Sequence, residues 1–515
     1  MAKLEMLKAV FSRDKLRAFF MGKIYPIVVA LIVIVGYFSG LEFYLHFVNM
    51  ALVCVALLVC ESLRPVIMPL CSFVFQISME NTPADFNPNG TQNYYFEGAR
   101  LPLLVISFVC VFSALVYFFI KNKAITKKSL LSLPYLVPTA VLSLAFLAGG
   151  AFSGEWAGGE LGFSLVQIVC WFVIFYILVL GLKNEGAKEL TEYLVYVSSL
   201  IAIILIVEVL EIYITTEDMM SESGEYINRR FLRYGWGVCN NAAQAIGVFV
   251  PVMFIGAVKN ERLGYRIYYF AIATLAFIGS IMNASRTALV IGVPMYIVCL
   301  VIFVIKSKQK LLCLFEIFTV ASIMAVLLVP ISAEIELLVA NYLTRGMDDS
   351  GRYDIWRHGI EMFKEHPIFG LGAFGLSASL GYNNYVSFIP YMMHNTFVQM
   401  LGAYGAFGFI AYIFYRISCA TAFFRKPTFE KSMMGLALLS VLVGSMLDNF
   451  VFQILPMFYF STCFAVVNKH VEEQKSGGCV SISQNKQSTD APSVNDVEQR
   501  TAEDTEAETR EDLIF

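Results

Sequence analysis

Charged residues are scarce in this chain of 515 residues. Asp, Glu, Lys and Arg together make up 15% of it, whereas hydrophobic residues make up 58%. Soluble globular domains carry charge on about a quarter of their residues, so this composition excludes an ordinary soluble protein. The net charge of −3 sums segments that we expect on two sides of a membrane, and it indicates no nucleic-acid partner.

Patterned cysteines are also lacking. Most of the eleven cysteines stand singly inside apolar runs, as Cys54, Cys110 and Cys170 do. Neither the spacing of a disulfide framework nor that of a metal site is present, and no acidic cluster completes a set of metal ligands with the histidines. We therefore interpret the cysteines as small apolar packing residues, and we predict neither a metal nor another cofactor.

Long apolar runs are what the chain does contain. Runs of roughly 18 to 22 residues match the length that a helix needs to cross about 30 Å of hydrocarbon. Strands of a membrane barrel would alternate over about ten residues, and these runs do not. We predict an all-α, polytopic bundle of about 12–14 transmembrane helices. The run from Pro65 to Ile77 is short enough to be re-entrant.

Positive charge orients the predicted bundle. Lys and Arg gather in the short connections at 121–128, 183–189, 259–266 and 306–310 and around Arg416, on the same side as the basic N-terminus. The positive-inside rule makes this side the cytoplasm, so both termini are predicted to be cytoplasmic. The long connection from Ser332 to His394 then lies outside the cytoplasm.

These assignments divide the chain into five parts. The last is acidic and has few apolar residues, so we expect it to be disordered. The predicted parts are a basic cytoplasmic N-terminus (1–24), a first group of transmembrane helices (25–331), an extracytoplasmic loop with catalytic elements (332–394), C-terminal transmembrane helices (395–468) and a cytoplasmic tail (469–515).

The large loop contains an amphipathic segment. Trp356, Ile360 and Phe363 recur at helical spacing, which predicts a helix from about Tyr353 to Glu365 that ends at His366–Pro367. Such a helix can lie flat on a membrane and present Arg352, just before its first turn, to a lipid headgroup. Alternatively, the helix packs only against the bundle and Arg352 is a solvated charge.

Three glycines follow this helix in a G-x-G-x-x-G pattern. Gly370, Gly372 and Gly375 match the spacing of a dinucleotide fingerprint, but no β-strand precedes them and no βαβ unit surrounds them. We therefore predict that they allow a tight turn and a close backbone approach to a neighbour or a ligand.

Single polar residues at the predicted outer ends of spans are candidates for chemistry. Arg286 is either an interfacial anchor or a guanidinium fork for a lipid phosphate. His394 is either a hydrogen-bonded interfacial residue or a proton acceptor for an attacking hydroxyl. Glu208 and Glu211 are expensive in lipid, so we expect both to face the interior of the bundle.

Three blocks in fixed order resemble a known family. They are Ser285-Arg286, the stretch GRYDIWRHGIEMFKEHPIFGLGAFG from Gly351, and MHNTFVQMLGAYGAFGFI from Met393. Together they resemble the O-antigen ligase and O-antigen polymerase superfamily, integral membrane glycosyltransferases that act on undecaprenyl-diphosphate-linked glycans. The resemblance covers about 282–410, whereas the first half of the chain is similar only as a set of spans.

The resemblance implies an inverting, metal-independent glycosyl transfer at the outer face of a bacterial cytoplasmic membrane. Arg286 and Arg352 would hold the lipid diphosphate, and His394 would act as base or orienting group. Further residues of the same blocks are predicted to bind substrate: Arg345, Arg357, Trp356, His366, Gly370, Gly372, Asn395 and Gln399.

The resemblance leaves the acceptor open. It implies an undecaprenyl-diphosphate-linked oligosaccharide as donor, with a growing surface polysaccharide, a lipid or a protein as acceptor. One polymerase feature is missing, because none of Arg345, Arg352 and Arg357 is followed by glycine at the spacing R-x10-G. The competing hypothesis is a polysaccharide flippase or another multispan transporter, for which we would expect broken helices or charged residues at mid-membrane.

Overall fold

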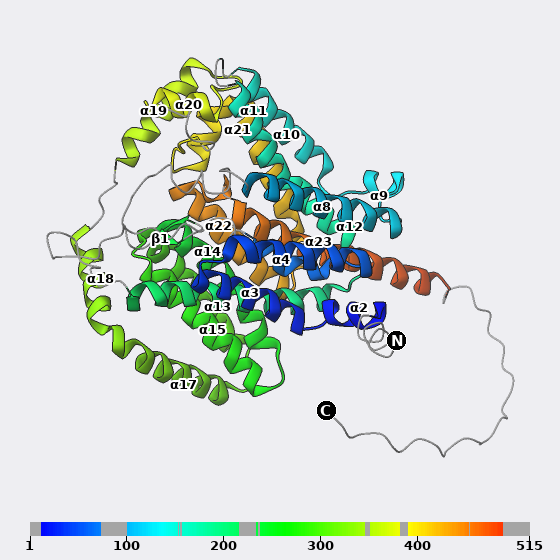
Figure 1. Ribbon diagram of the computed structural model, residues 1–515, viewed down its shortest axis with the longest axis vertical. Helices are drawn as coiled ribbons and strands as arrows, with labels where there is room; N and C mark the ends of the chain where they lie inside the picture. The colour runs from blue at the N-terminus through cyan, green and yellow to red at the C-terminus, as the bar shows by residue number, and fades with distance from the viewer. Residues whose placement is uncertain are drawn as a thin grey trace. The chain divides into compact units, whose positions relative to one another are not determined.

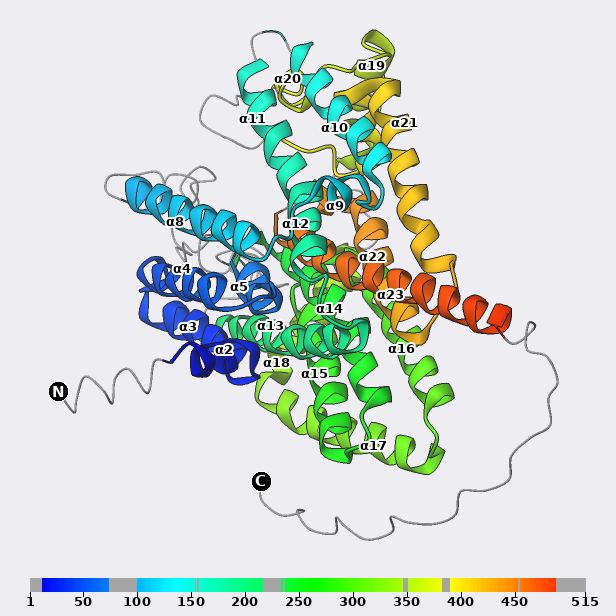
Figure 2. The ribbon, with the colours of Figure 1, turned by 90° about the vertical axis from the view of Figure 1, so that its right-hand side faces the viewer.

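The computed structural model describes residues 12–73, 100–152, 154, 157–215, 233–234, 237–345, 351–381, 390–452 and 454–487. The prediction of an all-α polytopic bundle is confirmed (Figures 1 and 2). The strands in the described part are one short antiparallel pair, β1 (Arg233–Tyr234) and β2 (Gly237–Val238). The chain divides into two compact units, Met1–Val471 and Glu472–Phe515.

The helices follow one another with short connections. The first half of the described chain contains α2 (Arg13–Met21), α3 (Ile24–Ser39), α4 (Glu42–Val59), η1 (Arg64–Val66), α5 (Ile67–Ser72), α8 (Arg100–Lys121), α9 (Lys127–Leu131), α10 (Leu136–Ala151), α11 (Ala157–Ile168), η3 (Val169–Val173), α12 (Ile174–Gly181) and α13 (Ala187–Thr215). The second half contains α14 (Cys239–Lys259), α15 (Leu263–Met282), η4 (Ala288–Gly292), α16 (Val293–Lys306), α17 (Lys310–Leu328), η5 (Val329–Ile331), α18 (Ser332–Arg345), α19 (Arg352–Glu365), α20 (Ala373–Ser379), α21 (Thr396–Phe424), α22 (Phe429–Asp448), η6 (Phe450–Phe452) and α23 (Ile454–Gln487).

The number of long apolar helices is smaller than predicted. Among the described residues, eight helices are long and apolar enough to cross a membrane, or nine if α2 and α3, which meet at 70°, form one span. Three further apolar helices, at 43–59, 136–149 and 243–259, are shorter than 18 residues. The predicted 12–14 counted these shorter runs as full spans, because hydropathy alone does not measure where a helix ends.

The core of the bundle is built on α13. Its window is 72% buried, compared with 22% for α8, whose exposed Leu and Phe side chains suit contact with lipid. Glu208 on α13 is 1% exposed, and the Glu211 carboxylate accepts a 2.8 Å hydrogen bond from the Tyr37 hydroxyl. The prediction that both acids face the interior of the bundle is therefore confirmed.

Two predicted boundaries differ from the structure. The outer loop was expected to begin at Ser332, but α17, η5 and α18 form one helical run of 35 residues, 310–344. The tail was expected to lose regular structure after Lys469, but α23 continues to Gln487, and only 488–515 lies outside the described residues. In both places good helix formers such as Glu and Leu follow an existing helix, and extending a helix is much easier than starting one.

The central irregularity of the fold is a break in α21. At Gly405 the backbone takes φ 63° and ψ −164°, which divides the helix into two halves. Residues 367–372, which we call the inserted segment, occupy this break. The carbonyls of Gly402 and Ala403 accept from the N–H groups of Leu371 (3.1 Å) and Gly372 (2.8 Å).

The inserted segment also serves the second half of α21. The N–H groups of Ala406 and Phe407 donate to the carbonyls of Pro367 (2.8 Å) and Ile368 (3.1 Å). A helix end buried in a bundle needs such partners, since water cannot supply them. The break is therefore closed on both sides by backbone hydrogen bonds from one segment.

Glycine makes this insertion possible. Gly370 has φ +72°, and a Cβ on it would lie 2.3 Å from the carbonyl carbon of Ala403. A Cβ on Gly405 would lie 2.4 Å from the carbonyl oxygen of Ile368. The prediction of a close backbone approach to a neighbour is confirmed for Gly370, and Gly372, with φ +76°, also has a conformation that favours glycine.

A buried acid fixes the end of the inserted segment. Glu160 on α11 is fully buried, and its Oε2 accepts a 2.9 Å hydrogen bond from the N–H of Phe374 in the first turn of α20. Replacing Glu160 by alanine leaves this buried N–H unpaired, so we expect a loss of stability of about 1–3 kcal/mol. Glu160→Gln retains an acceptor and should lose less. Thermal unfolding in detergent measures the difference, and equal effects of the two substitutions would contradict this role for the acceptor.

Candidate functional site

The amphipathic helix of the predicted loop is present. It is α19, which begins at Arg352 and ends at Glu365, with His366 as C-cap. Arg352 is thus the first residue of the helix and not the residue before its first turn, because Gly351, with φ 75°, takes the N-cap position. The difference of one residue reflects the end of a helix, which sequence patterns place least accurately.

α19 packs against the first half of α21, where Figure 1 shows the two helices side by side with α20. A Cβ on Gly359 would lie 2.5 Å from Val398 and 3.4 Å from the sulfur of Met393. Arg352 precedes Gly359 by seven residues and therefore lies on the same face of α19, about 10 Å along the axis. Arg352 is held on the side of α19 that faces the His394 segment.

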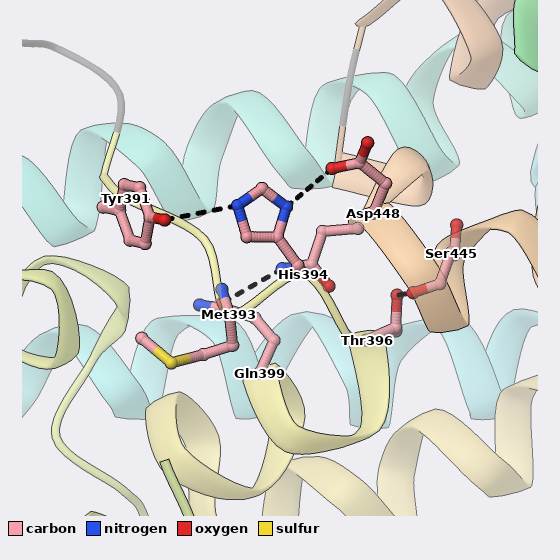
Figure 3. A network of polar contacts seen from close by, with 8 residues as sticks. Tyr391, Met393, His394, Thr396, Gln399, Ser445 and Asp448 are labelled. Atoms are coloured by element: carbon pink, nitrogen blue, oxygen red, sulfur yellow. Dashed lines mark hydrogen bonds and ion pairs between the residues drawn. The ribbon is translucent and has the colours of Figure 1, made fainter. Parts of the chain in front are cut away.

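His394 lies between a carboxylate and a phenol (Figure 3). Its Nδ1 is 2.7 Å from Asp448 Oδ1, at the end of α22, and its Nε2 is 3.3 Å from the Tyr391 hydroxyl. The side chain of His394 is 29% exposed and that of Asp448 is 8% exposed. The ring is therefore anchored on its buried side and accessible on the other.

Neighbouring side chains fix the turn that carries His394. Asn395 is the N-cap of α21, and its Oδ1 accepts from the N–H groups of Phe397 (2.9 Å) and Val398 (3.2 Å). The Thr396 hydroxyl donates to the Ser445 carbonyl on α22 at 2.9 Å. These contacts allow His394 to keep φ 52°, a left-handed conformation that is costly for a residue with a side chain.

Gln399 ties the same turn to the end of α22. Its Oε1 accepts from the Met393 N–H (2.9 Å) and from the Asn449 side-chain amide (3.3 Å). Asn449 directly follows Asp448, so the two partners of the histidine–carboxylate pair are fixed relative to each other. Asn395 and Gln399, which we predicted to bind substrate, both have structural roles in this turn.

The His394–Asp448 pair has the geometry of an oriented base. A carboxylate on Nδ1 favours the tautomer with the proton on that nitrogen, which leaves Nε2 able to accept one. Asp448 was not among the predicted site residues. The signal that could have found it is its position at the end of the apolar run Met433–Asp448, where a carboxylate is costly without a partner.

Arg286 is half-buried and begins the helix that continues through η4. Ile291 of η4 lies 3.6 Å from the place that a Cβ on Gly444 would occupy. Gly444 and Asp448 are four residues apart on α22 and share a face of that helix. Arg286 is therefore carried by an element that packs beside the Asp448 end of α22.

Other predicted site residues lie less close to this centre. Arg357 is 71% exposed and pairs with Asp354 at 3.3 Å on the surface of α19. His366 is exposed, and the Arg345 side chain lies outside what the structure describes. Trp356 is half-buried, and its Nε1 has no hydrogen-bond partner among the described residues.

The glycines and histidines complete the comparison with the sequence. Gly370 and Gly372, also predicted to bind substrate, form the inserted segment described above. His358 does not join His394 but lies 2.7 Å from the Ser379 hydroxyl, which connects α19 to α20. Within the described ranges, no group of three or more His, Cys, Asp and Glu side chains is placed to hold a metal ion.

The family comparison identifies this region. Residues 270–413 match the family model described as O-antigen ligase. The chain carries an O-antigen ligase domain. This domain contains Arg286, Arg352 and His394, and it confirms the superfamily that the three sequence blocks resemble. Asp448 lies beyond the matched residues. No curated protein matches the chain.

Proposed function

We propose that this chain transfers a glycan from undecaprenyl diphosphate to an acceptor hydroxyl at the outer face of the cytoplasmic membrane. The observation that carries the proposal is the His394–Asp448 pair, at 2.7 Å, inside an O-antigen ligase domain whose neighbouring elements present Arg286 and Arg352. A general base and a cationic site for a leaving diphosphate are the two functions that such a transfer requires.

The proposed reaction is an inverting displacement. The acceptor hydroxyl attacks the anomeric carbon on the face opposite the diphosphate, and its proton passes to Nε2 of His394. The bond between the anomeric carbon and the diphosphate oxygen breaks, and the electron pair leaves with the diphosphate. Asp448 stabilises the imidazolium that forms, while the guanidinium groups of Arg286 and Arg352 stabilise the leaving anion.

The competing transporter hypothesis gains less support. A broken helix does occur, at Gly405, and in transporters the ends of such half-helices contact the substrate. In this chain the ends are closed by backbone bonds from Pro367, Ile368, Leu371 and Gly372. The break therefore holds another part of the same chain and presents no half-helix terminus to an ion or solute there.

Removal of each arginine tests the proposal. We expect Arg286→Ala and Arg352→Ala to lower transfer by about 10²-fold each, because a diphosphate leaving group loses a charge-assisted partner. Lys364→Ala, on the exposed surface of α19, is the matched control and should transfer normally. The assay follows undecaprenyl-linked glycan in the host and in purified protein.

The products also identify the acceptor. Single repeat units that accumulate on the carrier would indicate a polymerase, and long chains that accumulate there would indicate a ligase. Normal transfer by both correctly inserted arginine variants would contradict the proposal.

A further inference from the structure

Four buried polar side chains near Arg286 carry hydrogen-bonding atoms that have no partner among the described residues. Both amide atoms of Gln244 and of Asn341 are unpaired, as are Asn283 Oδ1 and Ser285 Oγ. These side chains are 8%, 1%, 0% and 0% exposed, in that order. Buried polar groups are nearly always hydrogen-bonded in folded proteins, so four unpaired ones together require an explanation. We call these four residues the unpaired cluster.

Gln244 places the cluster next to the catalytic carboxylate. Its Oε1 lies 2.6 Å from the place that a Cβ on Gly444 would occupy. Because Gly444 and Asp448 share a face of α22, Gln244 lies one helical turn from Asp448. The side chain of His394, bonded to Asp448, is 29% exposed and marks where these elements reach the surface.

Asn283 and Ser285 lie on the turn that precedes Arg286. This turn is joined to α14, since the Ser280 hydroxyl donates to the carbonyl of Ala243, the neighbour of Gln244, at 2.7 Å. α18 covers the other side, because the hydroxyl of Tyr342, next to Asn341, donates to the Ile281 carbonyl at 2.8 Å. The cluster is thus bordered by Arg286 and by Asp448, and a sugar ring can enter only if α18 moves.

The unpaired atoms distinguish between possible ligands. Asn283 donates through Nδ2 to the Gly279 carbonyl at 2.6 Å, so its unpaired atom is an acceptor oxygen. Gln244 and Asn341 each present one donor and one acceptor. The oxygens of an ionised phosphate only accept and would leave these acceptors unpaired, whereas a sugar hydroxyl both donates and accepts.

We propose that the unpaired cluster binds hydroxyl groups of the donor glycan, beside the diphosphate that Arg286 holds. This inference rests on the proposed function, which supplies the diphosphate, and adds the residues that recognise the adjoining sugar. In this arrangement Arg286 recognises charge, the neutral amides recognise hydroxyls, and His394 meets the acceptor.

The first experiment measures stability without ligand. Gln244→Met and Asn341→Leu remove amides that make no hydrogen bond within the described chain, so thermal unfolding in detergent should occur at the same temperature as in the wild type or higher. Gln167→Met is the matched control. Gln167 donates to the Phe452 carbonyl (3.2 Å) and accepts from Trp171 Nε1 (2.9 Å), so its loss should lower the unfolding temperature.

The second experiment measures binding with two probes. One is the reducing oligosaccharide released by mild acid from the host's lipid-linked glycan, and the other is inorganic pyrophosphate. We expect Gln244→Met and Asn341→Leu to weaken protection by the oligosaccharide about tenfold and to retain protection by pyrophosphate. Arg286→Ala should show the reverse pattern. Asn49→Leu is the control for an unpaired buried amide elsewhere, in α4, and should bind both probes normally.

Two results would overturn the inference. One is full oligosaccharide protection in Gln244→Met and Asn341→Leu. The other is a loss of stability in these variants as large as that of Gln167→Met, which would make the cluster structural. Failure of the proposed function is a different result, in which wild-type protein transfers no glycan from undecaprenyl diphosphate, whatever the two probes show.

Discussion

Replacing His394 by alanine is expected to lower the rate of glycan transfer by about 10²- to 10⁴-fold, the range that general acid–base catalysis contributes. The substitution removes the group that takes the proton of the acceptor hydroxyl, while Arg286 and Arg352 still bind the donor. The loss should therefore appear in kcat and leave the affinity for the lipid-linked donor nearly unchanged.

Asp448→Asn tests how the base is oriented. Asparagine can donate as well as accept, so it no longer fixes the proton on Nδ1 of His394, and it lacks the negative charge that stabilises an imidazolium. We expect a loss in kcat of about 10²-fold or more. Single-turnover transfer in nanodiscs separates this step from binding.

The control for Asp448→Asn removes a carboxylate from the surface of α19. Asp354 is 81% exposed, and Asp354→Asn should transfer glycan at the wild-type rate, since exposed ion pairs contribute little. A wild-type rate in Asp448→Asn itself would mean that Asp448 does not position His394.

The second large effect concerns the break in α21. Gly405→Ala introduces a Cβ 2.4 Å from the Ile368 carbonyl oxygen at a residue with φ +63°, and both the contact and the left-handed conformation are unfavourable. We expect a loss of stability of about 3 kcal/mol or more, which is a large part of the stability of a typical protein. Gly370→Ala should be similar, because its Cβ meets the Ala403 backbone at 2.3 Å.

Gly264→Ala is the matched control for these substitutions. A Cβ there meets nothing within 4 Å, and Gly264 lies within α15, so alanine should leave stability unchanged or raise it slightly. Thermal unfolding of detergent-purified variants gives the comparison. Gly405→Ala with wild-type stability would show that the inserted segment can shift without cost.

Much of α19 could be predicted from the sequence, because helical periodicity and the terminal His366–Pro367 are local signals. The close approach of Gly370 could also be predicted, since a glycine-rich turn outside a βαβ unit has few other uses. The break at Gly405 could not, because it depends on hydrogen bonds between α21 and a segment more than thirty residues earlier.

The partnership of His394 with Asp448 shows the same limit. The two residues are 54 positions apart, and an aspartate at the end of one helix gives no sign of which histidine it will meet. Hydropathy similarly indicated where the chain is apolar but not how long each helix is, as the three helices shorter than 18 residues show. Local chemistry was legible in the sequence, whereas pairing between distant elements was not.

The inserted segment also constrains how this protein is assembled. A membrane helix usually closes its own hydrogen bonds as it enters the bilayer and associates with other helices afterwards. α21 does not fit this order, because four of the bonds around Gly405 are completed by Pro367, Ile368, Leu371 and Gly372, which are synthesised earlier. The final form of α21 therefore waits until the preceding loop has docked, and docking brings α19, with Arg352, against the His394 turn. Completion of this helix and construction of the candidate site are a single folding event.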